Sequence, residues 1–408
     1  MGTWDRCFLV VQVLIVWTYN TVSAVELCVT DNTGVHCGDG NHVRLTRISG
    51  NEVGHTQKIE TNDKQGSVTL KTLNTKPLVL EADNFLSAEE CDYFVKMATE
   101  EGLQESETVL NQPESQRFVL RDLDGNRKLS VREMRHTIQG SFDVYLDDED
   151  ILKMYKETGL DKNGDEMITD DELKGFSPMM LRKEIEKILK TSPEKHSRMS
   201  KQVWLYPDKS KDKVFATVQK RVAAIVGLPI ELIKLSDFQV VSYDIKGHYN
   251  AHWDSSRIET KVPCCTRERT KQCRICRYMT ILFYLNDVEG GGETAFPVAN
   301  NETLDYKSML EKEVIDLYRK CEDSPLRVAP AKGKAIIWYN HFVDEDTGWL
   351  GPLDEFTFHG GCPVKRGVKW IANFWVKTTD QKMKDLKKMQ KFYKESTKKQ
   401  PKISKEEL

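Results

Sequence analysis

The stretches GHYNAHWD at residues 247–254 and HGGCPVKRGVKW at residues 359–370 decide the fold of this chain. Residues i and i+2 of a strand point to the same face, so His252 and Asp254 can turn an imidazole and a carboxylate toward one metal ion. His359 is the second imidazole that we assign to this site. Two histidines and one carboxylate leave three adjacent coordination positions open, which is typical of a non-haem Fe(II) centre.

A lysine follows His359 within the apolar stretch VKWIANFWV at 368–376. Strand alternation predicts two faces, one with Lys369, Ile371, Asn373 and Trp375 and the other with Val368, Trp370, Ala372, Phe374 and Val376. A lysine that faces inward needs an anionic partner, because an unpaired buried charge costs several kcal/mol. The distal carboxylate of 2-oxoglutarate would be such a partner.

Residues 235–377 resemble the catalytic domain of the 2-oxoglutarate-dependent prolyl 4-hydroxylases. The resemblance is carried by FQVVSYDIKGHYNAHWD, RYMTILFYLNDVEGGGETAFP, KGKAIIWYN and HGGCPVKRGVKWIANFW, and it extends upstream through FLSAEECDYFVKMA, VWLYP and TLKTLNTKPLVLE. Within that family, the calcium-loop segment described below is similar to the transmembrane prolyl 4-hydroxylases. The resemblance covers most of residues 66–380.

The resemblance implies an α+β fold, namely a double-stranded β-helix (jelly-roll) oxygenase core with buttressing helices and an inserted all-α EF-hand pair. It implies iron on His252, Asp254 and His359. It also implies 2-oxoglutarate on Lys369, with O₂ as the second co-substrate and ascorbate as a further requirement. Tyr243 and Trp375 fall where such enzymes place aromatic side chains that contact the co-substrate, and packing in the core is the alternative for both.

The implied reaction is hydroxylation of a peptidyl proline at C4, of the procollagen-proline or hypoxia-inducible-factor type, so a proline-containing protein is the expected substrate. Hydroxylation of another residue, such as lysine, is an alternative on the same fold. An alternative of another class is a luminal calcium-binding or chaperone-like protein with an inactive oxygenase fold. The intact ligand set and Lys369 argue against that second alternative.

Two acidic loops, DLDGNRKLSVRE at 122–133 and DKNGDEMITDDE at 161–172, follow the EF-hand pattern of oxygen ligands with a glutamate at position 12. The side-chain ligands of this predicted pair are Asp122, Asp124, Asn126 and Glu133, and Asp161, Asn163, Asp165 and Glu172. Backbone carbonyls are expected from Lys128 and Met167. A helical insert with vestigial loops is the alternative interpretation.

Position 6 of each loop normally holds glycine, and this chain has Arg127 and Glu166 there. A side chain held in the left-handed conformation costs about 1–2 kcal/mol. We therefore expect weak calcium binding.

Both ends of the chain indicate the endoplasmic reticulum. Arg6 precedes the apolar run CFLVVQVLIVW at 7–17, and Val22-Ser23-Ala24 forms a small-residue cleavage pattern. An uncleaved signal anchor in the membrane is the alternative to a signal peptide. The final residues Lys-Glu-Glu-Leu resemble the signal read by the retrieval receptor of the endoplasmic reticulum.

The ten cysteines fit an oxidising compartment. Removal of the leader leaves an odd number, so at least one thiol is free or pairs between chains. Cys264, Cys265, Cys273 and Cys276 form a CC-x7-CxxC pattern, for which disulfides are favoured over a zinc site. Cys28 and Cys37 could close a small loop. Asn301 begins a glycosylation sequon in polar sequence and is expected on the surface.

The chain of 408 residues, with 39% hydrophobic and 30% charged content, is long enough for two domains. A net charge of −3 argues against a nucleic-acid-binding protein. A helix is predicted over 84–101 with Ser87 as its N-cap, and an amphipathic helix with a basic face over 382–398. The expected organisation is a signal peptide or anchor (1–24), a polar region and start of the catalytic fold (25–80), a buttressing helix (81–108), an EF-hand pair (109–190), the dioxygenase domain (191–380) and a basic helical tail (381–408).

Overall fold

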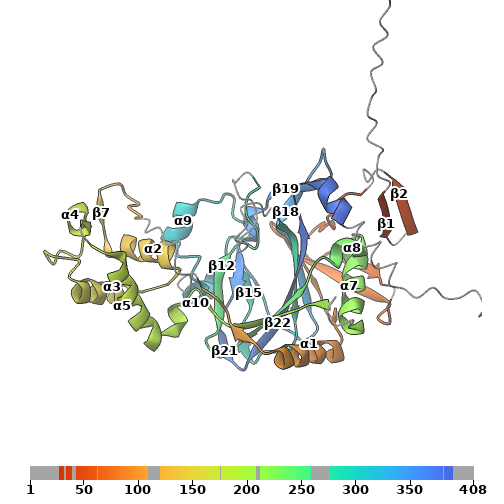
Figure 1. The fold of residues 1–408 in the computed structure, drawn as a ribbon, viewed down its shortest axis with the longest axis horizontal. Coiled ribbons are helices and arrows are strands. Elements are labelled where there is room, and N and C mark those ends of the chain that lie inside the picture. Colours follow the sequence, from red (N-terminus) through yellow and green to blue (C-terminus); the bar gives the residue numbers. More distant parts are fainter. Residues whose placement is uncertain are drawn as a thin grey trace, which may run out of the picture.

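Two antiparallel β-sheets form the centre of the chain in the computed structural model, which describes residues 27–31, 34–38, 43–61, 63–108, 120–174, 176–207, 212–258, 275–379 and 381–388 (Figure 1). The larger sheet has the order β3-β4-β5-β17-β13-β22-β11-β10-β6. Its strands are β3 (Thr56–Glu60), β4 (Ser67–Thr75), β5 (Leu78–Ala82), β17 (Ala335–Tyr339), β13 (Cys276–Tyr284), β22 (Lys369–Thr378), β11 (Phe238–Tyr243), β10 (Lys201–Leu205) and β6 (Gln104–Glu105).

The smaller sheet has the order β16-β15-β20-β12-β9. Its strands are β16 (Leu326–Val328), β15 (Thr294–Phe296), β20 (His359–Gly361), β12 (His248–His252) and β9 (Arg198–Met199). Two short pairs complete the strands of this region, β14 (Gly290–Gly291) with β21 (Val364–Arg366) and β18 (His341–Asp344) with β19 (Trp349–Leu353).

Side chains from both sheets share one apolar core, which includes Val241, Leu282 and Ile371 of the larger sheet and Phe296 and Val328 of the smaller one. The two sheets therefore pack face to face, as in a jelly roll. This arrangement confirms the predicted α+β fold with a double-stranded β-helix core.

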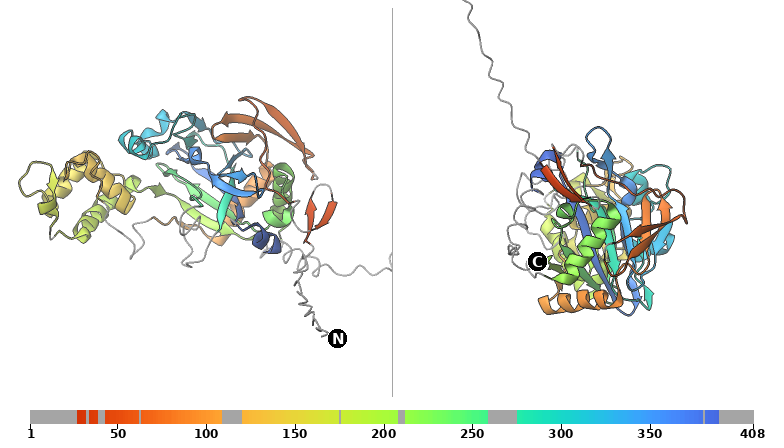
Figure 2. Two further views of the ribbon diagram at one scale, coloured as in Figure 1. Left: turned by 90° about the horizontal axis from the view of Figure 1, so that it is seen from above. Right: turned by 90° about the vertical axis from the view of Figure 1, so that its right-hand side faces the viewer.

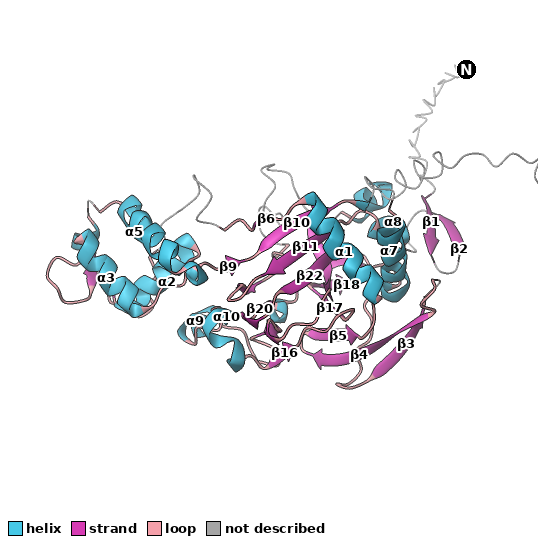
Figure 3. Cartoon of the chain, turned by 90° about the horizontal axis from the view of Figure 1, so that it is seen from below, coloured by secondary structure: helices cyan, strands magenta, loops and turns pink. Residues whose placement is uncertain are grey.

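Helices cover the outer face of the larger sheet. They are α1 (Ala88–Glu101), α7 (Lys213–Val226) and α8 (Ile230–Ile233), and Figure 3 shows α1 lying across this face. Phe94 of α1 and Phe215 of α7 pack edge to face at a centroid distance of 4.9 Å, and both contact Phe238 of β11. These aromatic contacts fix the helices on the sheet.

The helix predicted from residue 84 begins later, at Ala88. Ser87 is its N-cap as expected, and Ser87 and Glu90 form a capping box. Asn84 has a φ of 54°, which is incompatible with a helix, so the chain turns before the helix starts.

Two short helices, α9 (Tyr306–Glu311) and α10 (Leu317–Lys320), pack on the outer face of the smaller sheet. A disulfide joins Cys321, directly after α10, to Cys362, directly after β20. No pairing of these two cysteines was predicted. The bond ties the segment after α10 to the strand that carries His359.

Residues 120–191 form a helical unit with an apolar core of its own, which includes Met134, Ile138, Ile151, Met154 and Leu181. Its elements are β7 (Lys128–Leu129), α2 (Val131–Phe142), α3 (Asp148–Thr158), β8 (Ile168–Thr169), α4 (Asp170–Leu173) and α5 (Pro178–Thr191). Figure 2 shows this unit projecting from one end of the sheets. We call it the helical insert.

The helical insert is joined to the catalytic fold at a pair of adjacent strands. Strand β6 precedes it and β10 follows it, and Glu105 pairs with Lys201. The hydroxyls of Ser106 and Ser200, both buried, are 2.8 Å apart. The two ends of the insert are therefore held side by side.

The terminal segments are only partly described. Strands β1 (Leu27–Asp31) and β2 (Gly34–Gly38) form a hairpin whose register places Cys28 opposite Cys37. Residues 382–388 are helical, with Leu386 buried in the main core and Met383 exposed, so this part of the predicted tail helix packs on the domain. The apolar run at 7–17, Met389, Tyr393 and the final four residues lie outside the described residues. None of the described helices is long and apolar enough for a membrane span.

Candidate metal and co-substrate site

Strands β12 and β20 bring the three predicted metal ligands together. His252 ends β12, His359 begins β20, and the two residues are direct partners in the antiparallel ladder. Asp254 follows His252 by two residues and is buried. One ligand atom from each of the three side chains lies within 4.8 Å of the others. The smaller sheet therefore presents the two-histidine, one-carboxylate set on one face.

The orientation of each imidazole is fixed by a backbone carbonyl. The Nδ1 atom of His252 lies 3.0 Å from the oxygen of Asn250, and Nδ1 of His359 lies 2.7 Å from the oxygen of Thr357. Because a carbonyl oxygen only accepts, Nδ1 carries the proton in both rings and Nε2 keeps its lone pair. Each Nε2 atom is 3.7 Å from an oxygen of Asp254. The Nε2 atoms and this carboxylate can thus converge on one ion.

The protonation states also suit metal binding. Burial lowers the pKa of His359 to about 4, so its imidazole is neutral at neutral pH. Burial alone would raise the pKa of Asp254, but the facing side chains of His359 and His252 and the charge of Arg277 hold it well below its ordinary value. A neutral imidazole and an ionised carboxylate are the forms that bind metals.

Donors from the larger sheet hold the Asp254 carboxylate in place. Thr280 Oγ1 donates to Asp254 Oδ2 at 2.7 Å, and Trp375 Nε1 donates to the same oxygen at 2.9 Å. The guanidinium of Arg277 lies 3.3 Å from Oδ1 and 3.7 Å from the centre of the Trp375 ring. Trp375, predicted to contact the co-substrate, therefore also fixes a metal ligand.

A buried chain of hydrogen bonds stands behind Thr280. Asn340 Nδ2 donates to Thr280 Oγ1 at 2.9 Å, and Trp338 Nε1 donates to Asn340 Oδ1 at 3.0 Å. All three residues are almost fully buried. Neither Thr280 nor Asn340 was predicted as a site residue. The available signal for Thr280 was a hydroxyl on the inward face of the otherwise apolar strand RYMTILFYL, where a buried polar group needs a partner.

A pocket of about 200 Å³ opens between the sheets at these ligands. Its wall includes Lys369, Ile371, Asn373 and Trp375, whereas Ala372, Phe374 and Val376 lie in the core behind the sheet. The predicted alternation of this strand is therefore confirmed. The remaining wall residues are Arg198, Trp204, Gln239, Tyr243, Tyr249, His252, Trp253, Asp254, Arg277, Leu282, Thr294, His359, Gly360 and Gly361.

Lys369 lines this pocket and is only 2% exposed. Its Nζ atom lies 5.2 Å from the centre of the Tyr243 ring and 5.8 Å from that of Tyr284. Within the described part of the chain, no ion pair joins Lys369 to a carboxylate. Burial lowers the pKa of Lys369 to about 7, while the charge of Glu293 opposes this shift. An anion bound in the pocket would restore the ammonium form.

The residues present fit both groups that the resemblance implies. His252, Asp254 and His359 would hold Fe(II) with three positions left open. Lys369, which pairs with no carboxylate among the residues that the structure describes, would bind the distal carboxylate of 2-oxoglutarate, with Tyr243 beside it. The pocket thus offers a metal-binding end and an anion-binding end.

The two acidic loops of the helical insert repeat one hydrogen-bonding pattern. Asp122 accepts from the backbone nitrogens of Gly125 and Arg127, as Asp161 does from Gly164 and Glu166. The predicted position-12 residues also match: Glu133 accepts from Leu123 and Glu172 from Lys162. Strand β7 of the first loop and strand β8 of the second form a short antiparallel pair, which joins the two loops.

Each predicted left-handed residue has the expected backbone. Arg127 has a φ of 63° and Glu166 a φ of 61°. Asp122, Asp124 and Glu133 have carboxylate oxygens within 4.8 Å of one another. The other predicted ligand positions also lie within the described residues. They are Asn126 and Lys128 in the first loop and Asn163, Asp165 and Met167 in the second.

Other predicted positions have mixed outcomes. Asn301 is exposed, as expected. Cys276 is disulfide-bonded, in agreement with the preference for disulfides over zinc, while Cys264, Cys265 and Cys273 lie outside the described residues. Cys91 is a buried free thiol.

Comparison with known proteins shows the family to which the chain belongs. The sequence model of the 2OG-Fe(II) oxygenase superfamily matches residues 238–377. Transmembrane prolyl 4-hydroxylase from Homo sapiens is 36% identical over 355 residues, which cover 81% of this chain and 69% of the relative. The Mus musculus protein of the same name is 34% identical over 354 residues, with the same coverage of 81% and 69%.

A solved structure, the viral collagen prolyl hydroxylase of Paramecium Bursaria Chlorella virus-1 with 2-oxoglutarate, aligns with a TM-score of 0.36 and 19% identity, over 74% of this chain and 96% of that one. The fold, the site and the superfamily match define this chain as an Fe(II)- and 2-oxoglutarate-dependent oxygenase. The chain belongs to the transmembrane prolyl 4-hydroxylase family.

Replacing Lys369 by Ala should raise the KM for 2-oxoglutarate about 10- to 100-fold, because a charge-assisted bond is lost. The iron requirement should change far less. Steady-state kinetics with each component varied in turn measures both. An unchanged KM for 2-oxoglutarate would assign the role to another basic residue of the pocket, such as Arg277.

The affinity for 2-oxoglutarate should also depend on pH. Lys369 loses its proton as the pH rises through about 7 in the free protein, and the bound anion requires the charged form. The Kd should therefore rise by about tenfold per pH unit above that pKa and level off below it. Lys369→Arg, which stays charged, should flatten this profile. Calorimetry with saturating Mn²⁺ tests both proteins, and equal slopes would attribute the titration to a different group.

Thr280→Val should weaken metal binding by about 10- to 100-fold, because it removes a donor that orients the Asp254 carboxylate. Valine has nearly the same shape, so the fold should persist. Titration with Mn²⁺ measures the effect. Thr72→Val, at another buried threonine outside the pocket, is the matched control. Equal Mn²⁺ affinity in the wild type and Thr280→Val would exclude the orienting role.

Proposed function

We propose that this chain hydroxylates peptidyl proline at C4 in the endoplasmic reticulum, with Fe(II), 2-oxoglutarate and O₂ and with ascorbate as a supporting reductant. The observation that carries the proposal is the convergence of His252, Asp254 and His359 on one pocket with the buried Lys369, which has no ion-pair partner in the described part of the chain. The choice of proline rests on the relatives, which are named prolyl 4-hydroxylases.

Each residue of the pocket has a role in this proposal. When bound, iron and 2-oxoglutarate supply the oxidative chemistry, in which 2-oxoglutarate is decarboxylated to succinate. His252, Asp254 and His359 hold the metal, and Thr280 and Trp375 keep the carboxylate oriented. Both sheets enclose the pocket and limit the access of water. A separate general acid or base is not needed, since the protein has only to place a C–H bond near the metal.

Two alternatives remain distinct from this proposal. The first is hydroxylation of another residue, such as lysine, by the same site. The second is a luminal calcium-binding or chaperone-like role without catalysis. The complete ligand set and the intact hydrogen bonds behind Asp254 favour an active oxygenase over the second alternative.

The proposed location rests on sequence features and on oxidised cysteines. The signal-like segment and the final Lys-Glu-Glu-Leu support entry into the endoplasmic reticulum and retrieval by its receptor. The Cys321–Cys362 disulfide and the disulfide-bonded Cys276 suit an oxidising lumen. If the N-terminal segment stays uncleaved, the same catalytic domain would be anchored in the membrane facing the lumen.

We also propose that the helical insert is an EF-hand pair that binds calcium weakly. The repeated bond pattern of the two loops and the β7–β8 pairing support this assignment. The left-handed Arg127 and Glu166 support the weak affinity, because a glycine would adopt that backbone without cost.

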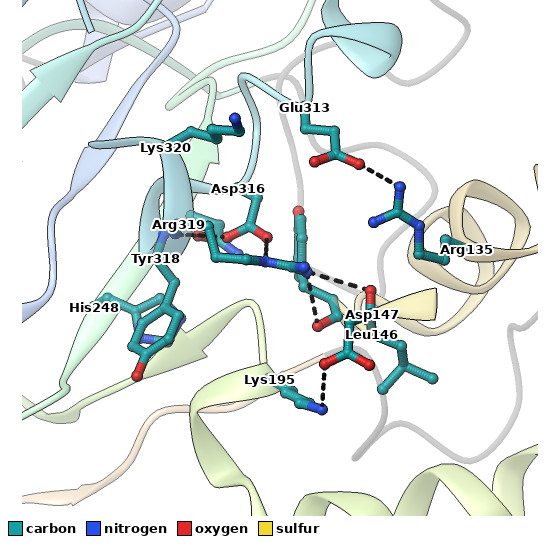
Figure 4. Close-up of polar contacts among 12 residues, drawn as sticks. Arg135, Leu146, Asp147, Lys195, His248, Glu313, Asp316, Tyr318, Arg319 and Lys320 are labelled. Atoms are coloured by element: carbon teal, nitrogen blue, oxygen red, sulfur yellow. Dashed lines mark hydrogen bonds and ion pairs between the residues drawn. The ribbon is translucent and has the colours of Figure 1, made fainter. Parts of the chain in front are cut away.

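Contacts between the helical insert and the segment 306–320 give calcium a route to the active site. Lys307 Nζ of α9 donates to the carbonyl oxygen of Leu123, which lies inside the first loop, at 2.7 Å. Arg135 of α2 pairs with Glu313, as Figure 4 shows. Ordering of the first loop would therefore act directly on α9 and the residues that follow it.

The segment 306–320 in turn contacts the metal-binding strand. The carbonyl oxygen of Ile315 accepts from the backbone nitrogen of Ala251 at 2.9 Å, one residue before His252. Arg319 donates to the carbonyl oxygens of Tyr145 and Leu146 in the insert, both at 3.3 Å (Figure 4). Calcium would modulate activity by this route only if it binds two arrangements of these contacts with different affinity.

Mass spectrometry of proline-containing peptides incubated with Fe(II), ascorbate and 2-oxoglutarate tests the reaction. We expect a gain of one oxygen atom on proline with release of succinate. Asp254→Ala should lose both products and keep its fold, because the metal binds a site built by folding. Asp244→Ala, at an exposed aspartate outside the pocket, should retain them. Full turnover by Asp254→Ala would disprove the iron assignment, and oxidation of lysine alone would favour the first alternative.

Calorimetry of the full chain should give calcium dissociation constants on the order of 10⁻⁴ to 10⁻³ M. The double substitution Glu133→Gln and Glu172→Gln should abolish this binding, lower the thermal stability in calcium, and change the peptide KM more than the iron affinity.

Glu149→Gln, on the exposed surface of α3, is the control for these two substitutions and should behave as the wild type. If the wild-type chain binds no calcium, or if the double variant titrates identically, the insert is a structural spacer.

A further inference from the structure

A second cleft lies beside the metal pocket, and Trp253 lines both. This cleft has a volume of about 380 Å³. Its lining is apolar at Leu304, Met309 and Leu353 and polar or charged at Ser255, Arg257 and Glu355. Trp253 lies between His252 and Asp254 in the sequence. The cleft and the metal pocket therefore share this side chain as part of their walls.

The metal pocket is too small for a peptide chain. Its volume of about 200 Å³ falls below the roughly 300–1,000 Å³ of sites that enclose a drug-sized ligand. With 2-oxoglutarate at Lys369, the remaining space suits one side chain of a substrate. The residues on either side of a target proline must therefore lie on the surface next to the pocket.

The adjoining cleft is built from large apolar side chains. Leu304, Met309 and Leu353 form its walls together with the rings of Trp253 and Tyr306. Tyr306 is 46% exposed, and the guanidinium of Arg121 lies 5.4 Å from the centre of its ring. An exposed apolar surface of this kind, next to an active site, indicates a place where a ligand is covered and held.

The ring of Trp253 is fixed before any ligand arrives. Its Nε1 atom donates to the carbonyl oxygen of Glu355 at 2.8 Å, and its ring packs against Phe358 at a centroid distance of 4.4 Å. A rigid aromatic anchor binds with little loss of conformational entropy. Proline-containing segments are extended and already stiff, and aromatic-lined grooves are a recurring way to bind them.

We propose that this cleft, which we call the Trp253 cleft, binds an apolar side chain that flanks the target proline of the substrate. The substrate class is thereby narrowed to extended peptide segments with a hydrophobic residue near the proline. This inference rests on the proposed function, since it takes a peptide as the substrate of the metal site. It makes Tyr306 and Leu353 determinants of sequence specificity.

Affinity selection on an immobilised library of short peptides, each with one central proline, tests the proposal. The full chain is used with Fe(II) and 2-oxoglutarate under argon, so that binding occurs without turnover. The wild type should enrich large apolar residues at a fixed distance from the proline. Tyr306→Ala and Leu353→Arg, from two different segments that line the cleft, should lose this enrichment.

Kinetics with the enriched peptides gives the second measurement. Tyr306→Ala and Leu353→Arg should raise the peptide KM by about tenfold, in the range seen for anchoring aromatic residues. Their KM for 2-oxoglutarate and their uncoupled decarboxylation of 2-oxoglutarate should stay within about twofold of the wild type, which also shows that they fold. Tyr306→Phe should restore the peptide KM, because the hydroxyl of Tyr306 is not needed for an apolar contact.

Phe342→Ala is the control, because Phe342 is exposed to a similar degree, 44%, and lies outside the cleft. It should bind the same peptides as the wild type. Equal enrichment by the wild type and both cleft variants, or no enrichment by the wild type, would overturn the proposal. Enriched peptides that bind the cleft without gaining oxygen on proline would instead contradict the proposed reaction and leave the cleft as a peptide site.

Discussion

One ionised carboxylate inside the protein constrains the rest of the structure. Asp254 is buried, and a buried charge without partners would be too costly to keep. The larger sheet supplies its neutral donors, Thr280 from β13 and Trp375 from β22, and the smaller sheet supplies the two imidazoles that face it. The carboxylate is therefore satisfied only when the two sheets are in their native relation, so metal binding and sheet packing depend on the same geometry.

Strand β22 carries both a hydrogen-bond donor to Asp254 and the lysine predicted to bind the co-substrate. Its inward face carries Trp375 beside Asp254 and, six residues earlier, Lys369, while Phe374 and Val376 on its other face build the main core. The strict alternation of a strand makes this division possible. A shift of one residue in the register of β22 would move the lysine into the core and the core residues into the pocket, so the apolar face protects the placement of the functional one.

The sequence predicted best the features that depend on the regular geometry of a single strand or loop. The convergence of His252 with Asp254, the two faces of β22 and the left-handed backbone of Arg127 and Glu166 follow from spacing within one strand or loop, and the structure has each of them. The chain Trp338–Asn340–Thr280 was not predicted, because its hydrogen bonds join residues far apart in sequence and depend on which strands become neighbours.

Three further features of the structure were not predicted from the sequence. The pairing of Cys321 with Cys362 could not be read from the spacing of the cysteines, since many connectivities are compatible with one sequence. The late start of α1 depends on a positive φ at Asn84, where the periodic pattern had suggested helix. The Trp253 cleft is formed by three separate segments, so only the folded chain brings its walls together.

The adjacent strands β6 and β10 have a consequence for how this architecture can change. The helical insert leaves and re-enters the oxygenase at neighbouring positions, with Ser106 beside Ser200. The entropy of closing a loop grows only slowly with its length, so the number of residues between these two points changes the closure entropy only slightly. Because His252, Asp254, His359 and the donors Thr280 and Trp375 all lie outside the insert, evolution could change the length of the insert while these residues keep their places on the two sheets.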